Sequence, residues 1–215
     1  KHYLHKENGI LADVNACIEY MLNRVNEIDD EQWRPWCQKI ENWKEKYSDD
    51  LEFNTSIELN PNLMIKEIGK LIPDNSVITC DVGQNQIWMA QSLRAKGMNI
   101  RILNSGGLGT MGYSLPAAIG AYYADSSKNV MAFMGDGGLQ MNIQELQMIS
   151  NYNLPIKVIV LKNNALGLIR DVHEKYYDRR YVGSVIGFSV PPLDKLASTY
   201  NMHYIKVSDY EEISN

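Results

Sequence analysis

The sequence predicts an α/β fold, with a doubly wound and mostly parallel sheet that has helices on both faces and is preceded by a helical linker segment. Three observations predict it. Short apolar runs, which suit strands buried on both faces, recur between positions 77 and 161. Helical patterns separate these runs, and glycine-rich turns follow several of them. Parallel strands need right-handed crossover connections, and ligands of such sheets bind at the carboxyl ends of the strands.

The first sixty or so residues are expected to form two helices and a linker. Asp13 is placed to cap a helix with apolar residues at helical spacing. A second helix, from about 30 to 46, places Trp33, Trp36 and Trp43 on one face, which we expect to pack against a neighbouring surface. Positions 52–62 are polar and include a proline, which favours a linker.

The main domain, residues 62–215, is expected to alternate helices with strands. Helices are expected at 63–71, 86–93, 114–124, 143–150, 167–175 and 193–200. Strands are expected at 77–80, 100–103, 130–134, 156–161 and 203–207. A long polar and aromatic loop is expected at 176–190. Because the chain stops at Asn215 just after another helix begins, we expect the domain to be truncated at its C-terminal edge.

Composition and charge exclude several classes of protein. The chain has 215 residues, 21 Lys and Arg against 26 Asp and Glu, and a formal net charge of −5. Nucleic-acid and membrane partners are not expected, because both need clustered basic or long apolar segments. The three cysteines share no metal-like spacing, and the start has neither a secretory leader nor an initiating Met. We therefore expect a soluble, cytoplasmic protein whose N-terminus lies upstream.

Three polar or glycine-rich segments follow expected strands and should meet at one edge of the sheet: 81–86, 105–112 and 135–138. The second contains G-x-G-x-x-G at Gly107, Gly109 and Gly112, the pattern of a dinucleotide-binding turn. One alternative is therefore a dinucleotide-binding oxidoreductase domain. The other is that these glycines only allow the backbone to turn and to approach something closely.

The third segment favours a metal-bridged diphosphate. Gly137 and Gly138 leave backbone N–H groups open at a helix start, which suits a phosphate, while no Lys or Arg in the turn neutralises its charge. Asp136 can instead hold a divalent cation such as Mg²⁺, which prefers carboxylate and phosphate oxygens. Asn163 and Asn164 follow the neighbouring strand and offer amide oxygens of the same hard kind.

This pairing resembles the signature of thiamine diphosphate enzymes, in which G-D-G is followed about two dozen residues later by an asparagine pair. Segments 83–88, 105–121 and 138–161 are similar to the C-terminal cofactor-binding domain of the acetolactate synthase group. The resemblance extends over about 62–215. Residues 1–61 are similar to the tail of that family's central domain and its connecting helices.

The resemblance implies a set of site residues. The implied metal ligands are Asp136, the side chain of Asn163 and the backbone carbonyl of Ala165. The implied cofactor contacts are Gln84, Asn85, Gly109, Met111, Gly135, Gly137, Gly138 and Leu168. Among these, the segment from Gly109 to Met111 would hold the aminopyrimidine ring, and the flexible Met thioether would prop the cofactor in its bent conformation.

The resemblance further implies a thiamine diphosphate- and Mg²⁺-dependent enzyme that decarboxylates a 2-oxo acid, with pyruvate as the expected donor, and transfers the acyl carbanion to an acceptor. No catalytic residue is expected in this chain, because the family's glutamate belongs to a pyrimidine-binding domain of the partner subunit. Glu145 is interpreted as structural. The isolated chain is therefore expected to be inactive, the full-length protein to be a homodimer or homotetramer, and FAD to be possible only in the absent central domain.

The stretch 166–173 departs from the family pattern. Leu168, Asp171 and Val172 stand where acetolactate synthases usually carry Met, Gln and Trp. A valine in place of an indole enlarges the acceptor side, so a decarboxylase or carboligase with a different acceptor is kept as an alternative. Arg170 and His173 are interpreted as a solvated helix face in preference to pocket residues. A non-catalytic module that retains the fold is the remaining alternative.

Overall fold

The computed structural model describes residues 9–27, 30–47, 59–94 and 99–214. By internal contacts the chain divides into two compact units, Lys1–Ser48 and Asp49–Asn215. The assignment of residues 1–61 to a central-domain tail and linker stays a prediction. Of the expected linker at 52–62, positions 52–58 lie outside the described residues.

The described part of the first unit contains two α-helices, α1 (Val14–Leu22) and α2 (Arg34–Lys46), with 3₁₀ turns at Val25–Glu27 and Asp30–Gln32. The Asp13 carboxylate caps α1, as predicted, by accepting the N–H of Asn15 at 3.0 Å. α2 begins later than the expected position 30. Its start coincides with Pro35 in the first turn, where the N–H that proline lacks would have no helical partner.

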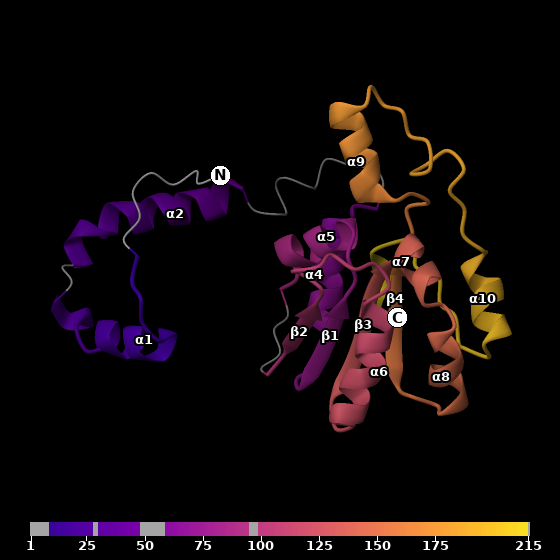
Figure 1. Cartoon of the computed structure of the whole chain (residues 1–215), viewed down its shortest axis with the longest axis horizontal. Coiled ribbons are helices and arrows are strands. Elements are labelled where there is room, and N and C mark those ends of the chain that lie inside the picture. The colour runs from indigo at the N-terminus through magenta and orange to yellow at the C-terminus, as the bar shows by residue number, and fades with distance from the viewer. Residues whose placement is uncertain (1–8, 28–29, 48–58, 95–98, 215) are drawn as a thin grey trace. The chain divides into compact units, whose positions relative to one another are not determined.

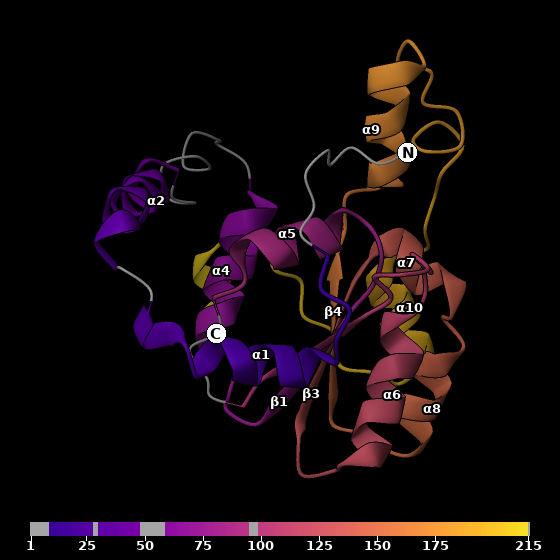
Figure 2. The same cartoon turned by 60° about the vertical axis from the view of Figure 1, so that its left-hand side comes forward.

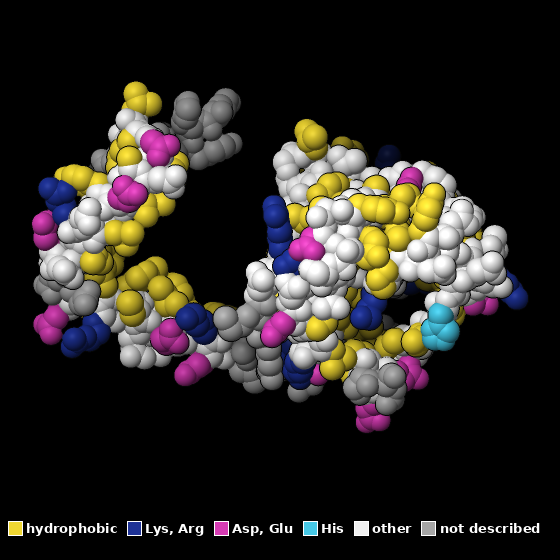
Figure 3. All heavy atoms as spheres, turned by 90° about the horizontal axis from the view of Figure 1, so that it is seen from below, with side chains coloured by type: hydrophobic (Ala, Val, Ile, Leu, Met, Phe, Trp, Pro, Cys, Tyr) yellow, Lys and Arg dark blue, Asp and Glu magenta, His cyan; other side chains and the backbone are white. Residues whose placement is uncertain are grey.

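Aromatic side chains of α2 pack on one another. The rings of Trp36 and Trp43 lie 5.6 Å apart in an edge-to-face arrangement, and the Lys39 ammonium lies 4.9 Å from the Trp43 ring. Both indoles remain almost half exposed, at 49% and 42%. Figure 3 shows apolar side chains gathered on this helical unit. The shared face is confirmed for Trp36 and Trp43, whereas Trp33 precedes α2 as its N-cap residue. The surface expected to cover this face stays a prediction.

The second unit is built on a four-stranded sheet (Figure 1). Its strands are β1 (Ser76–Cys80), β2 (Arg101–Asn104), β3 (Asn129–Gly135) and β4 (Ile156–Leu161). They are parallel and lie in the order β2-β1-β3-β4. The strand expected at 203–207 is wrong, because this segment is irregular in the structure. Its alternating pattern favoured an extended conformation, but a strand also needs a neighbour to bond, and among the described strands β4 pairs only with β3.

Helices of the second unit follow the predicted order. They are α4 (Pro61–Leu71), α5 (Gln84–Ser92), α6 (Ser114–Ala124), α7 (Asp136–Met141), α8 (Glu145–Asn151), α9 (Gly167–Tyr176) and α10 (Leu193–Thr199), with a 3₁₀ turn at Glu211–Ser214. The long loop expected at 176–190 is confirmed in essence, since no helix or strand lies between α9 and α10. The short α7 was not predicted as a separate helix.

The sheet is covered on both faces, as the doubly wound prediction requires, except at the edge strand β2, whose residues are mostly exposed. On one face, Val130, Ala132 and Met134 of β3 pack with apolar residues of α6 and α8. On the other, Met131 and Phe133 pack with residues of α4 and α5. Figure 2 shows α6 and α8 together on one side of the sheet and α4 on the other. The alternation along β3 therefore directs successive side chains into two separate cores.

The loops after β1, β3 and β4 leave the sheet at its carboxyl edge and lead into α5, α7 and α9 (Figure 1). Within the described part of the chain, no helix combines the length and the apolar character needed to cross a membrane.

Candidate functional site

A cavity of about 200 Å³ lies at the carboxyl edge of the sheet. Its walls come from the loops after β1, β3 and β4, the glycine segment before α6 and the start of α9. The structure brings every predicted site residue to this one cavity. These are Gln84, Asn85, Gly109, Met111, Gly135, Asp136, Gly137, Gly138, Asn163, Ala165 and Leu168.

Asp136 is a buried carboxylate in the cavity wall. It begins α7 directly after β3, and only 1% of its surface is exposed. Its Oδ1 accepts the N–H of Gly137 at 2.9 Å, and its Oδ2 accepts the N–H of Asn164 at 2.8 Å. Burial raises the pKa of this carboxyl group, while these N–H groups and Lys162 act in the opposite direction. Among the described residues none forms an ion pair with it, so a cation would satisfy its charge.

The segment after β4 is joined to Asp136 through the backbone of Asn164. Asn164 has a φ of 54°, in the left-handed region that asparagine tolerates better than most residues. This turn leaves Asn163 and Ala165 in the cavity lining, whereas Asn164 is exposed. Asn163 Oδ1 accepts the N–H of Ala165 at 3.1 Å. Of the two asparagines, Asn163 is therefore the one that lines the cavity.

The donor chemistry fits a hard cation. The described residues contain no group of three or more His, Cys, Asp or Glu side chains that could hold a metal. A cation in this cavity would instead meet the Asp136 carboxylate, the Asn163 amide and backbone oxygen. Such a set suits Mg²⁺, which takes one or two carboxylates and completes its shell with phosphate oxygens and water.

Glycines at the start of α7 allow close packing around the cavity. A Cβ on Gly137 would lie 2.7 Å from Leu166 Cδ2, and one on Gly138 would lie 2.2 Å from Asp81 Oδ2. Both contacts are shorter than real Cβ atoms tolerate. Glycine at these positions therefore makes room for Leu166 and Asp81 against the first turn of α7, where the Gly137 N–H is bonded to Asp136 Oδ1.

Asp81 was given no role in the sequence analysis. Its side chain hydrogen-bonds the segment after β1 to the glycine segment before α6, and both segments line the cavity. Its fully buried carboxylate follows β1 and accepts N–H groups from Val82 at 2.8 Å, Gly112 at 3.0 Å and Tyr113 at 3.2 Å. Burial raises the pKa of this carboxyl group, and the three N–H groups act against the shift. An acidic residue directly after an apolar strand was the available signal.

The G-x-G-x-x-G segment is a loop held against Asp81. Gly109 and Gly112 adopt φ values of 65° and 82°, which favour glycine. Gly109 and Met111 line the cavity, whereas Gly107 is not part of its lining. Glu145 begins α8 and is also outside the lining, in agreement with a structural role.

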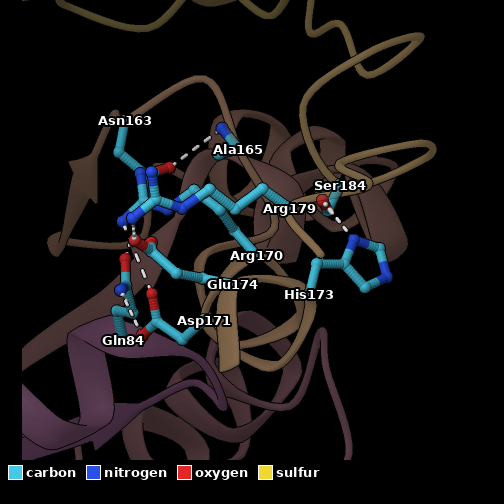
Figure 4. Close-up of polar contacts among 9 residues, drawn as sticks. All are labelled: Gln84, Asn163, Ala165, Arg170, Asp171, His173, Glu174, Arg179 and Ser184. Atoms are coloured by element: carbon cyan, nitrogen blue, oxygen red, sulfur yellow. Dashed lines mark hydrogen bonds and ion pairs between the residues drawn. The ribbon is translucent and has the colours of Figure 1, made fainter. Parts of the chain in front are cut away.

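The start of α9 contributes one side of the cavity lining. Figure 4 shows the polar contacts of α9 with neighbouring segments. The Gln84 amide donates to Asp171 Oδ2 at 2.9 Å, and Asn163 donates to Gln84 Oε1 at 3.2 Å. His173 instead points toward Ser184, with its Nδ1 3.1 Å from the hydroxyl oxygen. Neither His173 nor Arg170 lines the cavity, as expected. The expected solvated face holds only in part, because both residues are half-buried and His173 contacts the buried Ser184.

Comparison with known proteins identifies relatives of the chain. Residues 81–215 match a family model described as "Thiamine pyrophosphate enzyme, C-terminal TPP binding domain". The chain is 35% identical over 207 residues to the acetolactate synthase large subunit of Lactococcus lactis subsp. lactis (strain IL1403), covering 96% of this chain and 35% of that protein. It is 33% identical over 211 residues to the same subunit of Cyanidium caldarium, with 96% and 35% covered. A probable acetolactate synthase large subunit of Methanococcus aeolicus is 32% identical over 212 residues, with 95% and 35% covered. The chain thus spans about a third of the length of these curated relatives.

Proposed function

The chain belongs to the thiamine pyrophosphate enzymes and carries their C-terminal cofactor-binding domain, and from this membership we propose that it supplies the diphosphate half of a carboligase active site. The whole protein would decarboxylate a 2-oxo acid and transfer the remaining acyl unit to an acceptor. The observation that carries the proposal is the single cavity that gathers all predicted cofactor and metal residues. They come from four separate segments of the chain.

Within this site, Asp136, Asn163 and the backbone carbonyl of Ala165 would hold Mg²⁺. Gln84, Asn85 and the backbone N–H groups at the start of α7 would bind the diphosphate. Burial of Asp136 without an ion-pair partner supports the first assignment. The presence of Gln84, Asn85, Gly137 and Gly138 together in the cavity lining supports the second.

Bound thiamine diphosphate supplies the carbon nucleophile and the electron sink for decarboxylation, and the protein's share is binding and orientation. Gly109 and Met111 line the same cavity and would place the aminopyrimidine ring. An unbranched Met side chain can fill the irregular space under a bent ligand.

For the substrates, we propose pyruvate as donor, in keeping with the names of the relatives. A different acceptor is kept as the alternative. It rests on Val172 of α9, which stands where acetolactate synthases usually carry Trp, and in this chain Val172 is 41% exposed and lies outside the cavity lining. A product assay on the full-length enzyme with pyruvate alone, and then with other acyl acceptors, separates acetolactate formation from a related carboligation.

We also propose that the full-length enzyme is a homodimer or homotetramer in which a second domain holds the pyrimidine ring and supplies the catalytic glutamate. FAD would bind, if at all, outside these 215 residues. The isolated chain should accordingly bind cofactor and turn over no substrate.

The cofactor assignment is tested by calorimetric titration of the full chain with thiamine diphosphate, with Mg²⁺ and then with a chelator present. We expect Mg²⁺-dependent binding that Asp136→Ala weakens at least about tenfold, as loss of a metal ligand should. The control is Asp125→Ala, since Asp125 is exposed beyond the end of α6 and outside the cavity lining. Unchanged affinity in Asp136→Ala would overturn the metal role, and NADH binding without a divalent cation would favour the dinucleotide alternative.

A further inference from the structure

Hydrogen bonds connect three side chains in series, from Asp171 on α9 through Gln84 to Asn163 at the proposed cation site (Figure 4). Gln84 Nε2 donates to Asp171 Oδ2 at 2.9 Å, and Asn163 Nδ2 donates to Gln84 Oε1 at 3.2 Å. Asn163 Oδ1 is left on the opposite side of its amide, where it accepts the N–H of Ala165 at 3.1 Å. The three side chains come from different elements, so the tertiary fold brings them together.

The donor and acceptor roles in these hydrogen bonds follow from the carboxylate of Asp171. An ionised carboxylate only accepts hydrogen bonds, whereas an amide accepts with its oxygen and donates with its nitrogen. Next to Asp171, the Gln84 amide must therefore present its nitrogen, which leaves its oxygen for Asn163. Asn163 must then present its nitrogen to Gln84. Its oxygen consequently faces Ala165 and the proposed cation, which needs an oxygen ligand.

The shape of α9 holds Gln84 in place independently of amide orientation. Gly167 and Asp171 are four residues apart and so lie on the same face of this helix. A Cβ on Gly167 would lie 2.0 Å from Gln84 Oε1, so the Gln84 side chain occupies the space that glycine leaves. The Gln84 side chain therefore packs against the backbone of Gly167 and hydrogen-bonds to Asp171, one turn further along α9.

We propose that Asp171 is a positioning residue that, through Gln84, keeps the amide oxygen of Asn163 turned toward the cation site. This inference rests on the proposed function, because it requires Asn163 to be a cation ligand. The other carboxylate oxygen of Asp171 lies 3.7 Å from the Arg170 guanidinium, and the pair is partly exposed. Asp171 thus couples α9 to the cavity without lining it.

Two measurements on the full 215-residue chain test the inference. The first is calorimetric affinity for Mg²⁺ in the presence of thiamine diphosphate. We expect Asp171→Ala to weaken it about tenfold, the usual effect of losing a group that orients a metal ligand. Asp171→Asn keeps an acceptor oxygen and should lose less. The matched control is Glu174→Ala, which removes a carboxylate from the same helix that pairs with Arg179 and not with Gln84. It should change the affinity less than about twofold, because exposed charges are screened.

The second measurement is the NMR spectrum of the side-chain amides without any ligand. Asp171→Ala should shift the NH₂ resonances of both Gln84 and Asn163, and Glu174→Ala should shift neither. If Asp171→Ala leaves the Asn163 resonances in place, the positioning role is overturned whatever the affinities are. If Asp136→Ala abolishes Mg²⁺ binding while Asp171→Ala matches Glu174→Ala, the metal site stands and the positioning role fails. If Asp136→Ala has no effect, the proposed function fails, and this inference fails with it.

Discussion

Gly138 lies directly against the carboxylate of Asp81: a Cβ at Gly138 would come within 2.2 Å of Asp81 Oδ2. That oxygen also accepts the N–H of Gly112 at 3.0 Å. One buried contact therefore joins the end of β1, the glycine segment before α6 and the first turn of α7. The walls of the cavity are thus fixed relative to one another before any ligand binds.

Gly138→Ala should lower the free energy of unfolding by about 1–3 kcal/mol, the usual cost of forcing extra volume into a packed site. Urea denaturation provides the measurement. Gly120→Ala is the control, since nothing lies within 4 Å of a Cβ there and the residue is exposed in α6. Replacing this helical glycine should stabilise the chain by about 0.5–1 kcal/mol. Equal effects of the two substitutions would contradict the contact with Asp81.

Asp81 should make stability depend on pH. Burial raises the folded-state pKa of its carboxyl group above the ordinary 3.8, so the charged form is disfavoured in the folded chain. Its contribution to the free energy of unfolding is then full below 3.8 and is lost as the pH rises through the folded-state pKa. Asp81→Asn removes this dependence.

The check is urea denaturation of the wild type and Asp81→Asn from about pH 4 to about pH 8. The difference in unfolding free energy, wild type minus variant, should decrease with pH and then level off. Asp125→Asn is the control, because hydrogen bonds from Ser127 lower the pKa of Asp125. Its difference should stay constant over this range, since Asp125 titrates only below the ordinary 3.8. A rising difference for Asp81→Asn would show that its bonds outweigh burial.

Trp88 should report ligand binding by fluorescence. It lines the cavity, whereas the other three tryptophans belong to the first unit. Addition of thiamine diphosphate with Mg²⁺ should change the emission of the wild type and of the triple variant Trp33→Phe, Trp36→Phe, Trp43→Phe. Trp88→Phe should remove most of that change. A response that survives in Trp88→Phe and vanishes in the triple variant would place binding elsewhere.

Substitution of Phe133 should lower the stability of the fold more than substitution at most other core positions. It is fully buried in the centre of β3, within the core shared with α4 and α5. Phe133→Ala should lower the free energy of unfolding by about 3–5 kcal/mol, because it leaves a cavity in a close-packed interior. Leu108→Ala, at a side chain that is 91% exposed, should stay within about 0.5 kcal/mol of wild type. Thermal or urea unfolding measures both.

The sheet could be predicted from sequence because its strands are short apolar runs, and β3 and β4 lie within a residue of their expected bounds. α7 was missed because it is six residues long and begins with two glycines after Asp136, which have poor helix propensity. The prediction of a strand at 203–207 was wrong because a periodic pattern does not specify the strand with which a segment pairs.

The site residues that line the cavity could be named from motifs because each motif follows a strand, and parallel strands end at one edge. The contacts between these motifs could not be predicted from the sequence. The bond from Gln84 to Asp171 joins residues 87 positions apart and depends on the direction in which α9 leaves the sheet. The role of Asp81 likewise depends on which N–H groups the glycine segment presents to it.

The strand order has a consequence for how such a protein can change. From β1 the chain goes by way of α5, on one face, to β2, while β3 continues through α7 and α8 on the other face to β4. The connections after β1 and β3 thus diverge, and connectivity alone opens a crevice between them. Side chains around that crevice can be exchanged without closing it. Substrate preference can therefore drift by substitution at the rim while the scaffold is inherited intact.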